Sequence, residues 1–268
     1  MRIAHLTPPS ATYLIPERST WPADVTVEDV LVRVDVPLAT DPARLTIKDL
    51  VYVDAAVTAE RAGFDAIFVN TVADYGVDLI RGTTALPTAG AGESSIAAAL
   101  SAAPSFGIVT VWPSSTQIYY DRVLAATGTA ASCTGTRYVL EEPELGEHGG
   151  GAGAMAAAHD PGSPIAARVL ATALRTVEED GAASIVLGCS CMSRLTPMLR
   201  EALDVPVVDP RHTGFEATVA AARAPRAEVA VNPDTTARIV AAVDVWQQLG
   251  DSVTSAWDEE CGDACAIA

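Results

Sequence analysis

The residue best suited to chemistry in this sequence is Cys189, which directly follows the apolar run ASIVLG (183–188). That run predicts a buried strand, and Thr196 with Pro197 predicts that a helix begins soon after it. A thiol at a strand end, just before a helix N-terminus, has a lowered pKa and can act in acid–base or nucleophilic chemistry. Cys191 is interpreted as a packing neighbour, since buried cysteines are commonly inert core residues. We therefore take Cys189 as the catalytic candidate.

An internal similarity identifies the position opposite Cys189. The segments FDAIFVNT (64–71) and AASIVLGC (182–189) have the same length and the same apolar pattern, and aligned without a gap they place Thr71 opposite Cys189. Because ligands bind at the carboxyl ends of strands in α/β sheets, we expect these two residues to enclose a small ligand. A threonine hydroxyl has a far higher pKa than a thiol, so it serves as a hydrogen-bonding group rather than as a base.

Other polar residues at predicted strand ends are suited to hold a substrate carboxylate or a developing enediolate. They are Asn70 beside Thr71, Gly188 and Ser190 beside Cys189, Pro8 and Ser10 after the first strand, Thr110, Ser114, Ser115 and Thr116 after a middle strand, and His212 after VVDPR. The alternative for each is a local role, since the same residue types cap helices and turns. Asp74 is likewise a turn former or a second base.

The elements that must position these residues alternate between strands and helices. Apolar runs predict strands at 2–6, 64–70, 106–112, 136–142, 183–188 and 205–210, and helical patterns lie between them and at 234–249. Capping boxes at Thr46–Asp49 and Thr213–Glu216 predict two of the helix starts. The segment GEHGGGAGAM (146–155) is interpreted as a mobile surface loop, or alternatively as a lid over a site. This alternation predicts an α/β fold with parallel sheets and helices on both faces.

Composition excludes several classes of protein. Of 268 residues, 49% are hydrophobic, which supports a sizeable core, and the net charge of −17 repels nucleic acids and anionic membranes. No apolar run approaches the roughly 18 residues needed to span a bilayer. The N-terminus does not have the pattern of a signal peptide, and an odd number of cysteines then favours reduced thiols in the cytoplasm.

Cofactor-dependent chemistry is also poorly supported. Lys48 is the only lysine, GK[ST] is absent, and no GxGxxG follows the first strand, so pyridoxal phosphate, nucleoside triphosphate and dinucleotide enzymes are disfavoured. The pair Cys261 and Cys265 lies in an acidic tail that we expect to be disordered, without further ligands for a metal. We therefore expect neither a cofactor nor a metal.

The motifs around these residues resemble those of the aspartate/glutamate racemase superfamily, and within it the hydantoin racemase-like branch. VLGCSCM (186–192) is similar to the family's second catalytic cysteine motif, and VPVVDP (205–210) follows at the expected distance. FVNTVADYG (68–76) occupies the place of the first cysteine motif, but with Thr71 in place of the cysteine. PTAGAGESS (87–95) and FGIVTVWPSSTQIYY (106–120) are also similar to segments of the family.

The resemblance implies two pseudo-symmetric α/β domains with the site in the cleft between them and no cofactor. Residues 1–104 and 213–268 would form the first domain, with a tail after about 250, and residues 105–212 the second. It implies carbanion chemistry on a small carboxylate or cyclic imide, with Asn70 and Thr71 as the pair that binds a substrate carboxylate. The resemblance does not decide whether the protein forms a homo-oligomer.

The missing first cysteine leaves several reactions open. Racemisation or epimerisation is the family default, whereas decarboxylation, as in arylmalonate decarboxylase, needs only one proton donor. Maleate cis–trans isomerases use a cysteine as a nucleophile. A binding protein that has lost the chemistry is the alternative of a different class, against which the motif LGCSCM (187–192) argues.

Overall fold

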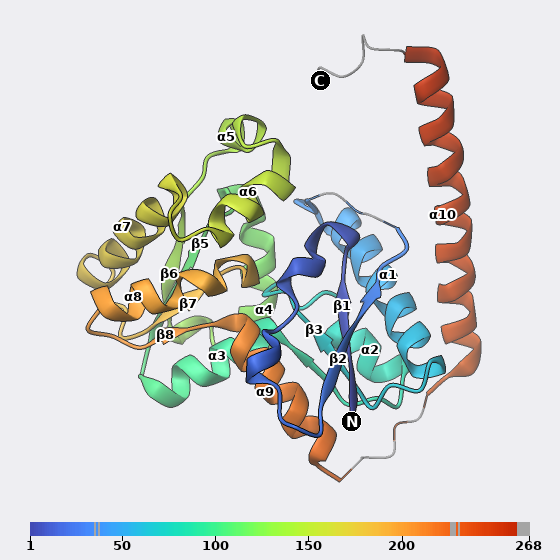
Figure 1. Ribbon diagram of the computed structural model, residues 1–268, viewed down its shortest axis with the longest axis horizontal. Helices are drawn as coiled ribbons and strands as arrows, with labels where there is room; N and C mark the ends of the chain where they lie inside the picture. The colour runs from blue at the N-terminus through green and yellow to red at the C-terminus, as the bar shows by residue number, and fades with distance from the viewer. Residues whose placement is uncertain (35, 37, 226–228, 230, 262–268) are drawn as a thin grey trace.

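The chain folds around two parallel four-stranded sheets (Figure 1). The computed structural model describes residues 1–34, 36, 38–225, 229 and 231–261, the last twelve of these as backbone only. The first sheet contains β1 (Arg2–Thr7), β2 (Thr26–Leu31), β3 (Ala66–Val69) and β4 (Thr88–Gly90). The second contains β5 (Phe106–Thr110), β6 (Cys133–Tyr138), β7 (Ile185–Leu187) and β8 (Val207–Val208). The predicted α/β class with parallel sheets is confirmed.

Both sheets have the same topology. The strand order is β2-β1-β3-β4 in the first sheet and β6-β5-β7-β8 in the second, so β3 and β7 are the third strand of their respective halves. These are the two strands that the internal comparison paired. In each sheet the chain changes direction beside the first strand, and the crevice at such a switch point is where α/β proteins bind ligands. The loops after β3 and β7 therefore occupy equivalent ligand-binding positions.

The described part of the chain contains ten α-helices, most of which pack around the two sheets. They are α1 (Pro42–Arg61), α2 (Val77–Thr83), α3 (Ala91–Ala102), α4 (Gln117–Thr127), α5 (Glu142–Glu147), α6 (Gly150–His159), α7 (Pro164–Glu178), α8 (Thr196–Ala202), α9 (Pro210–Arg223) and α10 (Pro233–Cys261). Helix α9 returns from the second sheet to pack on β3, β4 and α3, and α10 packs on α1 and α2. We therefore propose the division 1–104 plus 213–268 and 105–212 as the domain boundaries.

Two helices begin earlier than the capping boxes predict. Helix α1 begins at Pro42, with the carboxylate of Asp41 accepting from the Arg44 N–H at 2.9 Å. Helix α9 begins at Pro210, with Asp209 as its N-cap. In both cases an Asp–Pro pair starts the helix, because the Asp side chain caps it and the proline has the helical φ and needs no N–H partner.

The low-complexity segment is helical, so its interpretation as a mobile surface loop is wrong. Gly149 and Gly150 adopt positive φ at the start of α6, and Ala154 and Ala158 are then fully buried. Helix α6 packs against the short 3₁₀ helix η5 (Ser190–Leu195), which follows Cys189. The small side chains permit this close approach, and tertiary packing overrides the low helix propensity of glycine.

The C-terminal segment is helical to Cys261, which includes most of the predicted tail. Residues 262–268, with Cys265, lie outside the described residues. Within the described part of the chain, we find no helix both long and apolar enough to span a bilayer.

Asp74 has a structural role in the first half of the molecule. The backbone of Asp74 has a positive φ of 47°. Its carboxylate accepts hydrogen bonds from the N–H groups of Gly92 at 2.8 Å and Glu93 at 2.7 Å, and these two bonds cap helix α3. Burial raises the pKa of Asp74 to about 8, although these two N–H donors act in the opposite direction. Its side chain is committed to α3, so the structure favours the structural role over that of a second base.

We expect Asp74→Ala to lower the free energy of unfolding by about 1–2 kcal/mol, because α3 loses a cap that satisfies two backbone donors. Denaturant unfolding followed by circular dichroism measures this change. Asp78→Ala is the matched control, since the Asp78 side chain is 83% exposed at the start of α2. Equal destabilisation by the two variants would contradict the capping role.

Candidate active site

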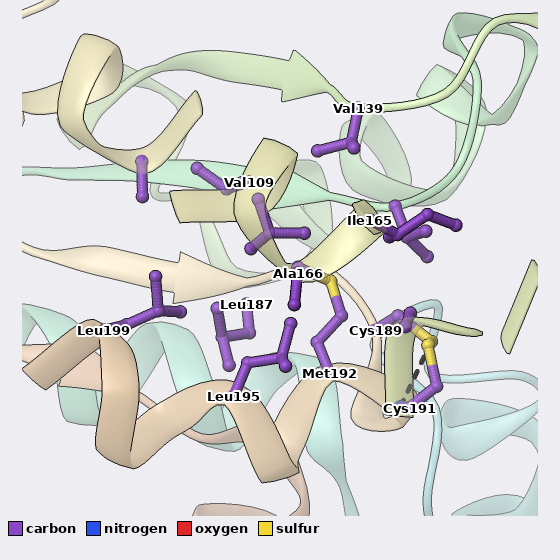
Figure 2. Close-up of a cluster of buried hydrophobic side chains, with 14 of the residues drawn as sticks. Val109, Val139, Ile165, Ala166, Leu187, Cys189, Cys191, Met192, Leu195 and Leu199 are labelled. Carbon is purple, nitrogen blue, oxygen red and sulfur yellow. Dashed lines mark hydrogen bonds between the residues drawn. A yellow bond between two sulfur atoms is a disulfide. The ribbon is translucent and has the colours of Figure 1, made fainter. Parts of the chain in front are cut away.

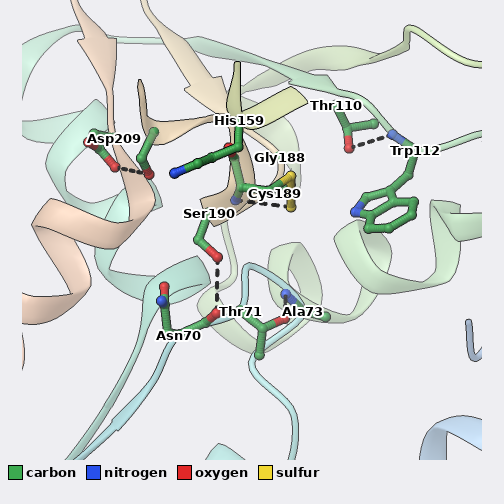
Figure 3. Close-up of a disulfide and its surroundings, with 12 residues drawn as sticks. Asn70, Thr71, Ala73, Thr110, Trp112, His159, Gly188, Cys189, Ser190 and Asp209 are labelled. Carbon is green, nitrogen blue, oxygen red and sulfur yellow. Dashed lines mark hydrogen bonds between the residues drawn. A yellow bond between two sulfur atoms is a disulfide. The ribbon is translucent and has the colours of Figure 1, made fainter. Parts of the chain in front are cut away.

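A cavity of about 420 Å³ lies where the strand ends of the two sheets meet. Thr7 and Pro8 reach it from the end of β1, Asn70 and Thr71 from the end of β3, and Gly188, Cys189 and Ser190 from the end of β7. Figure 3 shows Thr71 on the β3 side and Cys189 on the β7 side. The two residues that the internal comparison paired therefore line one cavity from opposite halves of the molecule.

Cys189 lies at the boundary between this cavity and the core of the second domain. It is 9% exposed and is the N-cap of η5, with its sulfur accepting from the Cys191 N–H at 3.3 Å. Cys191 is fully buried, as expected of a packing residue, but its sulfur is joined to that of Cys189 in a disulfide (Figure 2). In this form Cys189 has no free thiol, so the acid–base chemistry predicted for it requires the reduced form.

The backbone before Cys189 requires glycine. A Cβ on Gly188 would lie 2.6 Å from the Thr110 Cβ and 3.0 Å from the Tyr120 hydroxyl. That hydroxyl is fully buried, within 2.6 Å of Thr110 Oγ1 and 3.1 Å of the Gly188 carbonyl oxygen. Tyr120 and Thr110 thus hold the end of β7 from behind, and this close packing fixes where Cys189 enters the cavity.

A hydrogen bond joins the two halves beside the candidate pair. The Ser190 hydroxyl donates to the Asn70 carbonyl oxygen at 3.0 Å, and Figure 3 shows this bond between the two strand ends. Next to it, Thr71 Oγ1 accepts from the Ala73 N–H at 3.2 Å. The Thr71 hydroxyl proton remains available for donation into the cavity, whereas no base among the described residues is hydrogen-bonded to it.

A buried chain of polar groups orients Asn70. His5 Nδ1 lies 2.7 Å from Asp29 Oδ1, and His5 Nε2 lies 2.9 Å from Asn70 Nδ2, which also donates to the Leu14 carbonyl oxygen at 2.9 Å. Burial lowers the pKa of His5, so the ring is neutral with its proton on Nδ1 toward Asp29. Both N–H groups of the Asn70 amide are therefore committed.

The Asn70 amide oxygen is the one polar atom of this side chain that these hydrogen bonds do not satisfy. It is buried and has no hydrogen-bond partner among the described residues, although Asn70 lines the cavity. A buried acceptor without a donor costs free energy, so it is suited to a ligand that brings an N–H or O–H group. Asn70 as oriented here accepts a hydrogen bond from the ligand and does not donate one.

The rest of the cavity wall is mostly apolar and aromatic, and apart from segment 146–155, whose alternative interpretation was a lid, and Tyr119, the sequence did not single it out. It includes Ala11, Leu14, Val36, Leu38, Lys48, Tyr52, Tyr75, Trp112, Tyr119, Leu145, Gly151, Ala152 and Met155. Lys48 is the only charged side chain among the described residues of the wall, and its Nζ lies 4.7 Å from the Tyr75 ring centroid. Lys48 and Tyr52 are one turn apart on α1, a spacing that could have indicated a shared face.

The other predicted site residues are distributed as follows. Ser10 lines the cavity with Pro8, whereas Thr110 and Thr116 are fully buried behind it, and Thr116 Oγ1 donates to the Pro113 carbonyl oxygen at 2.8 Å. Ser114 and Ser115 are not part of the wall. His212 lies at a different cavity, with Nε2 3.4 Å from Glu216. Within the segment 114–116, the Thr116 hydroxyl therefore makes a local turn contact, whereas the Ser115 hydroxyl oxygen is buried without a hydrogen-bond partner among the described residues.

Among the residues that the structure describes, no group of three His, Cys, Asp or Glu side chains is placed to hold a metal ion. The described wall contains one thiol-bearing residue, one lysine, several phenols and hydroxyls, and no carboxylate or imidazole. Such a wall is suited to a small, partly apolar ligand that one sulfur and a few hydrogen bonds contact.

Comparison with known proteins places this arrangement in a family. The sequence model for the Asp/Glu/Hydantoin racemase family matches residues 31–218. The hydantoin racemase of Paenarthrobacter aurescens is 30% identical over 146 residues, which are 54% of this chain and 56% of that protein. That of Rhizobium meliloti is 30% identical over 151 residues, 56% of this chain and 57% of that protein. The aligned part spans little more than half the length of these curated relatives.

Solved structures share the fold. The allantoin racemase of Klebsiella pneumoniae superimposes with a TM-score of 0.70 at 20% identity, covering 88% of this chain and 98% of that one. Arylmalonate decarboxylase superimposes with a TM-score of 0.55 at 18% identity, covering 83% and 93%. The family match covers β3, β4 and the whole second sheet, and it includes the loops that carry Thr71 and Cys189. The chain therefore belongs to the Asp/Glu/hydantoin racemase family.

Proposed function

We propose that this protein is a cofactor-independent enzyme of the racemase or isomerase type that forms and quenches a carbanion next to a carbonyl group. The observation that carries the proposal is the position of Cys189 at the end of β7, in a cavity whose opposite wall holds Thr71. Once reduced, the Cys189 thiolate takes the proton from one face of the substrate carbon. Return of that proton to the same face gives exchange alone, whereas inversion requires a solvent-derived proton delivered to the opposite face, on the side of Thr71. The Thr71 hydroxyl donates a hydrogen bond to the oxygen on which the negative charge develops.

The orientation of Asn70 favours one substrate class within this proposal. A bare carboxylate has only acceptor oxygens, so it gains no hydrogen bond from the Asn70 amide oxygen, which lacks a donor. A cyclic imide or ureide presents ring N–H groups and satisfies it. The relatives named hydantoin racemase and allantoin racemase are consistent with such a substrate. We therefore place cyclic imides ahead of simple carboxylates.

Decarboxylation of a small dicarboxylate is the second candidate, and the threonine at position 71 favours it. Racemisation through a planar carbanion needs an acid or base on each face, and Thr71 has no base hydrogen-bonded to it among the described residues. Loss of CO2 generates the carbanion directly and leaves one proton to be delivered, for which the Cys189 thiol is sufficient. Arylmalonate decarboxylase shares the fold.

Deuterium exchange separates these functions. The reduced protein is incubated in D2O with a 5-substituted hydantoin, allantoin, an arylmalonate and maleate, and the products are followed by NMR and polarimetry. Exchange with inversion on a cyclic imide supports a racemase, and CO2 release with one deuterium incorporated supports a decarboxylase. Binding without exchange or turnover on the whole panel would contradict an enzymatic role and favour a binding protein.

Activity should also depend on the redox state of Cys189. We expect turnover only under reducing conditions, because the disulfide with Cys191 removes the thiol that transfers the proton. Diamide should inactivate the enzyme and dithiothreitol restore it, with intact-protein mass spectrometry showing loss and regain of two hydrogens. Cys191→Ala is the matched variant and should not form this disulfide. Full activity of the oxidised protein would exclude Cys189 as the proton carrier.

A further inference from the structure

A second cavity, of about 460 Å³, is formed by elements from both halves of the molecule. Pro16, Glu17 and Thr20 contribute from the segment after β1, and Arg211 and His212 from the first turn of α9. Ser193, Arg194 and Thr196 contribute from η5 and the start of α8, which follow Cys189 in the chain. The lining residues of this cavity differ from those of the candidate active site, and the proposed function makes no use of them.

The side chains of two arginines at this cavity form no hydrogen bond or ion pair in the described part of the chain. Arg211 is only 7% exposed, and neither its guanidinium nor that of Arg194 has a hydrogen-bond or ion-pair partner there. Burial lowers the pKa of Arg211; the charges of Asp209 and Glu17 act against this change, and the charge of Arg194 acts with it. A buried guanidinium presents five N–H donors and pays a desolvation cost that only an acceptor can offset. The buried guanidinium of Arg211 is therefore suited to bind an external anion.

The acidic groups of the cavity do not fill this role. Asp209 accepts from the Ser193 hydroxyl at 2.5 Å and from the N–H groups of Arg211 at 3.0 Å and His212 at 3.3 Å, so its carboxylate caps α9. Neither Asp209 nor Glu17 forms an ion pair with a described arginine side chain. Both carboxylates act on Arg211 through their charge, but neither is hydrogen-bonded to its guanidinium.

A neutral group adds an independent observation. The Thr196 hydroxyl oxygen is buried without a hydrogen-bond partner among the described residues, in a residue that is 4% exposed and lines the same cavity. A hydroxyl that can donate, on the wall of the same cavity as two guanidinium groups, is suited to an oxyanion. A neutral or cationic ligand would leave both arginines unpaired.

We infer that this cavity is a binding site for a small oxyanion, a phosphate or carboxylate group held by Arg194, Arg211 and Thr196. The planar guanidinium groups match the oxygens of either anion, and the Thr196 hydroxyl supplies a further donor. Because Arg194 lies in η5 and Arg211 in the first turn of α9, the helix that packs on the first sheet, the anion links these two elements. The chain's net charge of −17 makes general attraction of anions weak, so binding here depends on these residues.

Isothermal titration of the full-length protein with inorganic phosphate, and separately with succinate, tests this site at constant ionic strength in sodium chloride. We expect saturable binding of at least one of the two, and the stronger one identifies the anion as phosphate or carboxylate. Arg194→Gln and Arg211→Gln should each weaken it about tenfold or more, because each removes charge-assisted hydrogen bonds. Arg44→Gln is the control, since it changes the net charge equally at an arginine of α1 whose side chain is 60% exposed.

Further variants keep the outcome decisive. Arg194 is exposed, so Arg194→Gln reports on the site even if Arg211→Gln does not fold. Cys189→Ser should bind the anion with unchanged affinity, because Cys189 lines the other cavity. Absence of saturable binding, equal binding by wild type and Arg194→Gln, or loss of binding in Cys189→Ser would each overturn the proposal. The last result would place the anion in the candidate active site.

Discussion

Replacing Cys189 with alanine is expected to abolish turnover and deuterium exchange in the reduced protein. Proton transfer by a positioned group contributes about 10²–10⁴-fold to a rate, and the described cavity wall offers no carboxylate or imidazole to replace the thiol. Steady-state kinetics and NMR exchange on the substrate identified from the panel measure the loss. Cys189→Ser provides the conservative variant, which keeps the size of the side chain but not its acidity.

Two matched cysteine variants separate chemistry from packing. Cys191→Ala removes the disulfide partner, and Cys133→Ala removes the half-buried free cysteine in β6. Both should keep activity under reducing conditions, with circular dichroism confirming that each variant is folded. Activity of Cys189→Ala comparable to that of Cys133→Ala would show that the reaction does not pass through Cys189.

Replacing Thr71 with alanine is expected to weaken turnover without abolishing it. The Thr71 hydroxyl supplies one hydrogen bond to a charged oxygen, an interaction that typically contributes about 1.5–3 kcal/mol, or roughly a tenfold to hundredfold effect on rate. Thr71→Ser should retain most of the activity because it keeps the donor. Loss in Thr71→Ala as large as that in Cys189→Ala would identify Thr71 as an activated base or nucleophile.

Thr71→Cys tests the symmetry of the two halves directly. Since β3 and β7 are equivalent strands of two sheets with the same order, a cysteine at position 71 creates a thiol opposite Cys189. We expect this variant to gain or accelerate inversion at the substrate carbon, measured by polarimetry with deuterium exchange in parallel. Exchange without any increase in inversion would show that position 71 does not reach the second face of the substrate.

The positions of the candidate pair could be predicted because they depend on local patterns. A buried parallel strand is a short apolar run with a turn at its end, and two such runs of equal length place Thr71 and Cys189 at corresponding strand ends. The α/β class follows from the alternation of such runs with helical segments. The glycines of segment 146–155 favour a loop, whereas the structure forms a helix there. Ala154 and Ala158 of this helix are buried against η5, a partner that lies elsewhere in the chain.

The sequence by itself determined the fold class, the family and the identity of the two strand ends, because each depends on patterns of residues that are close together in the chain. Only the tertiary structure decided what the neighbouring groups do. Asn70 presents an acceptor because His5, 65 residues away, and Leu14, 56 residues away, take both of its N–H groups. Arg194 and Arg211 are recognisable as a pair only when α9 folds back beside η5. Such roles depend on hydrogen-bond partners and burial, which are fixed by contacts between distant segments and leave no local pattern in the sequence.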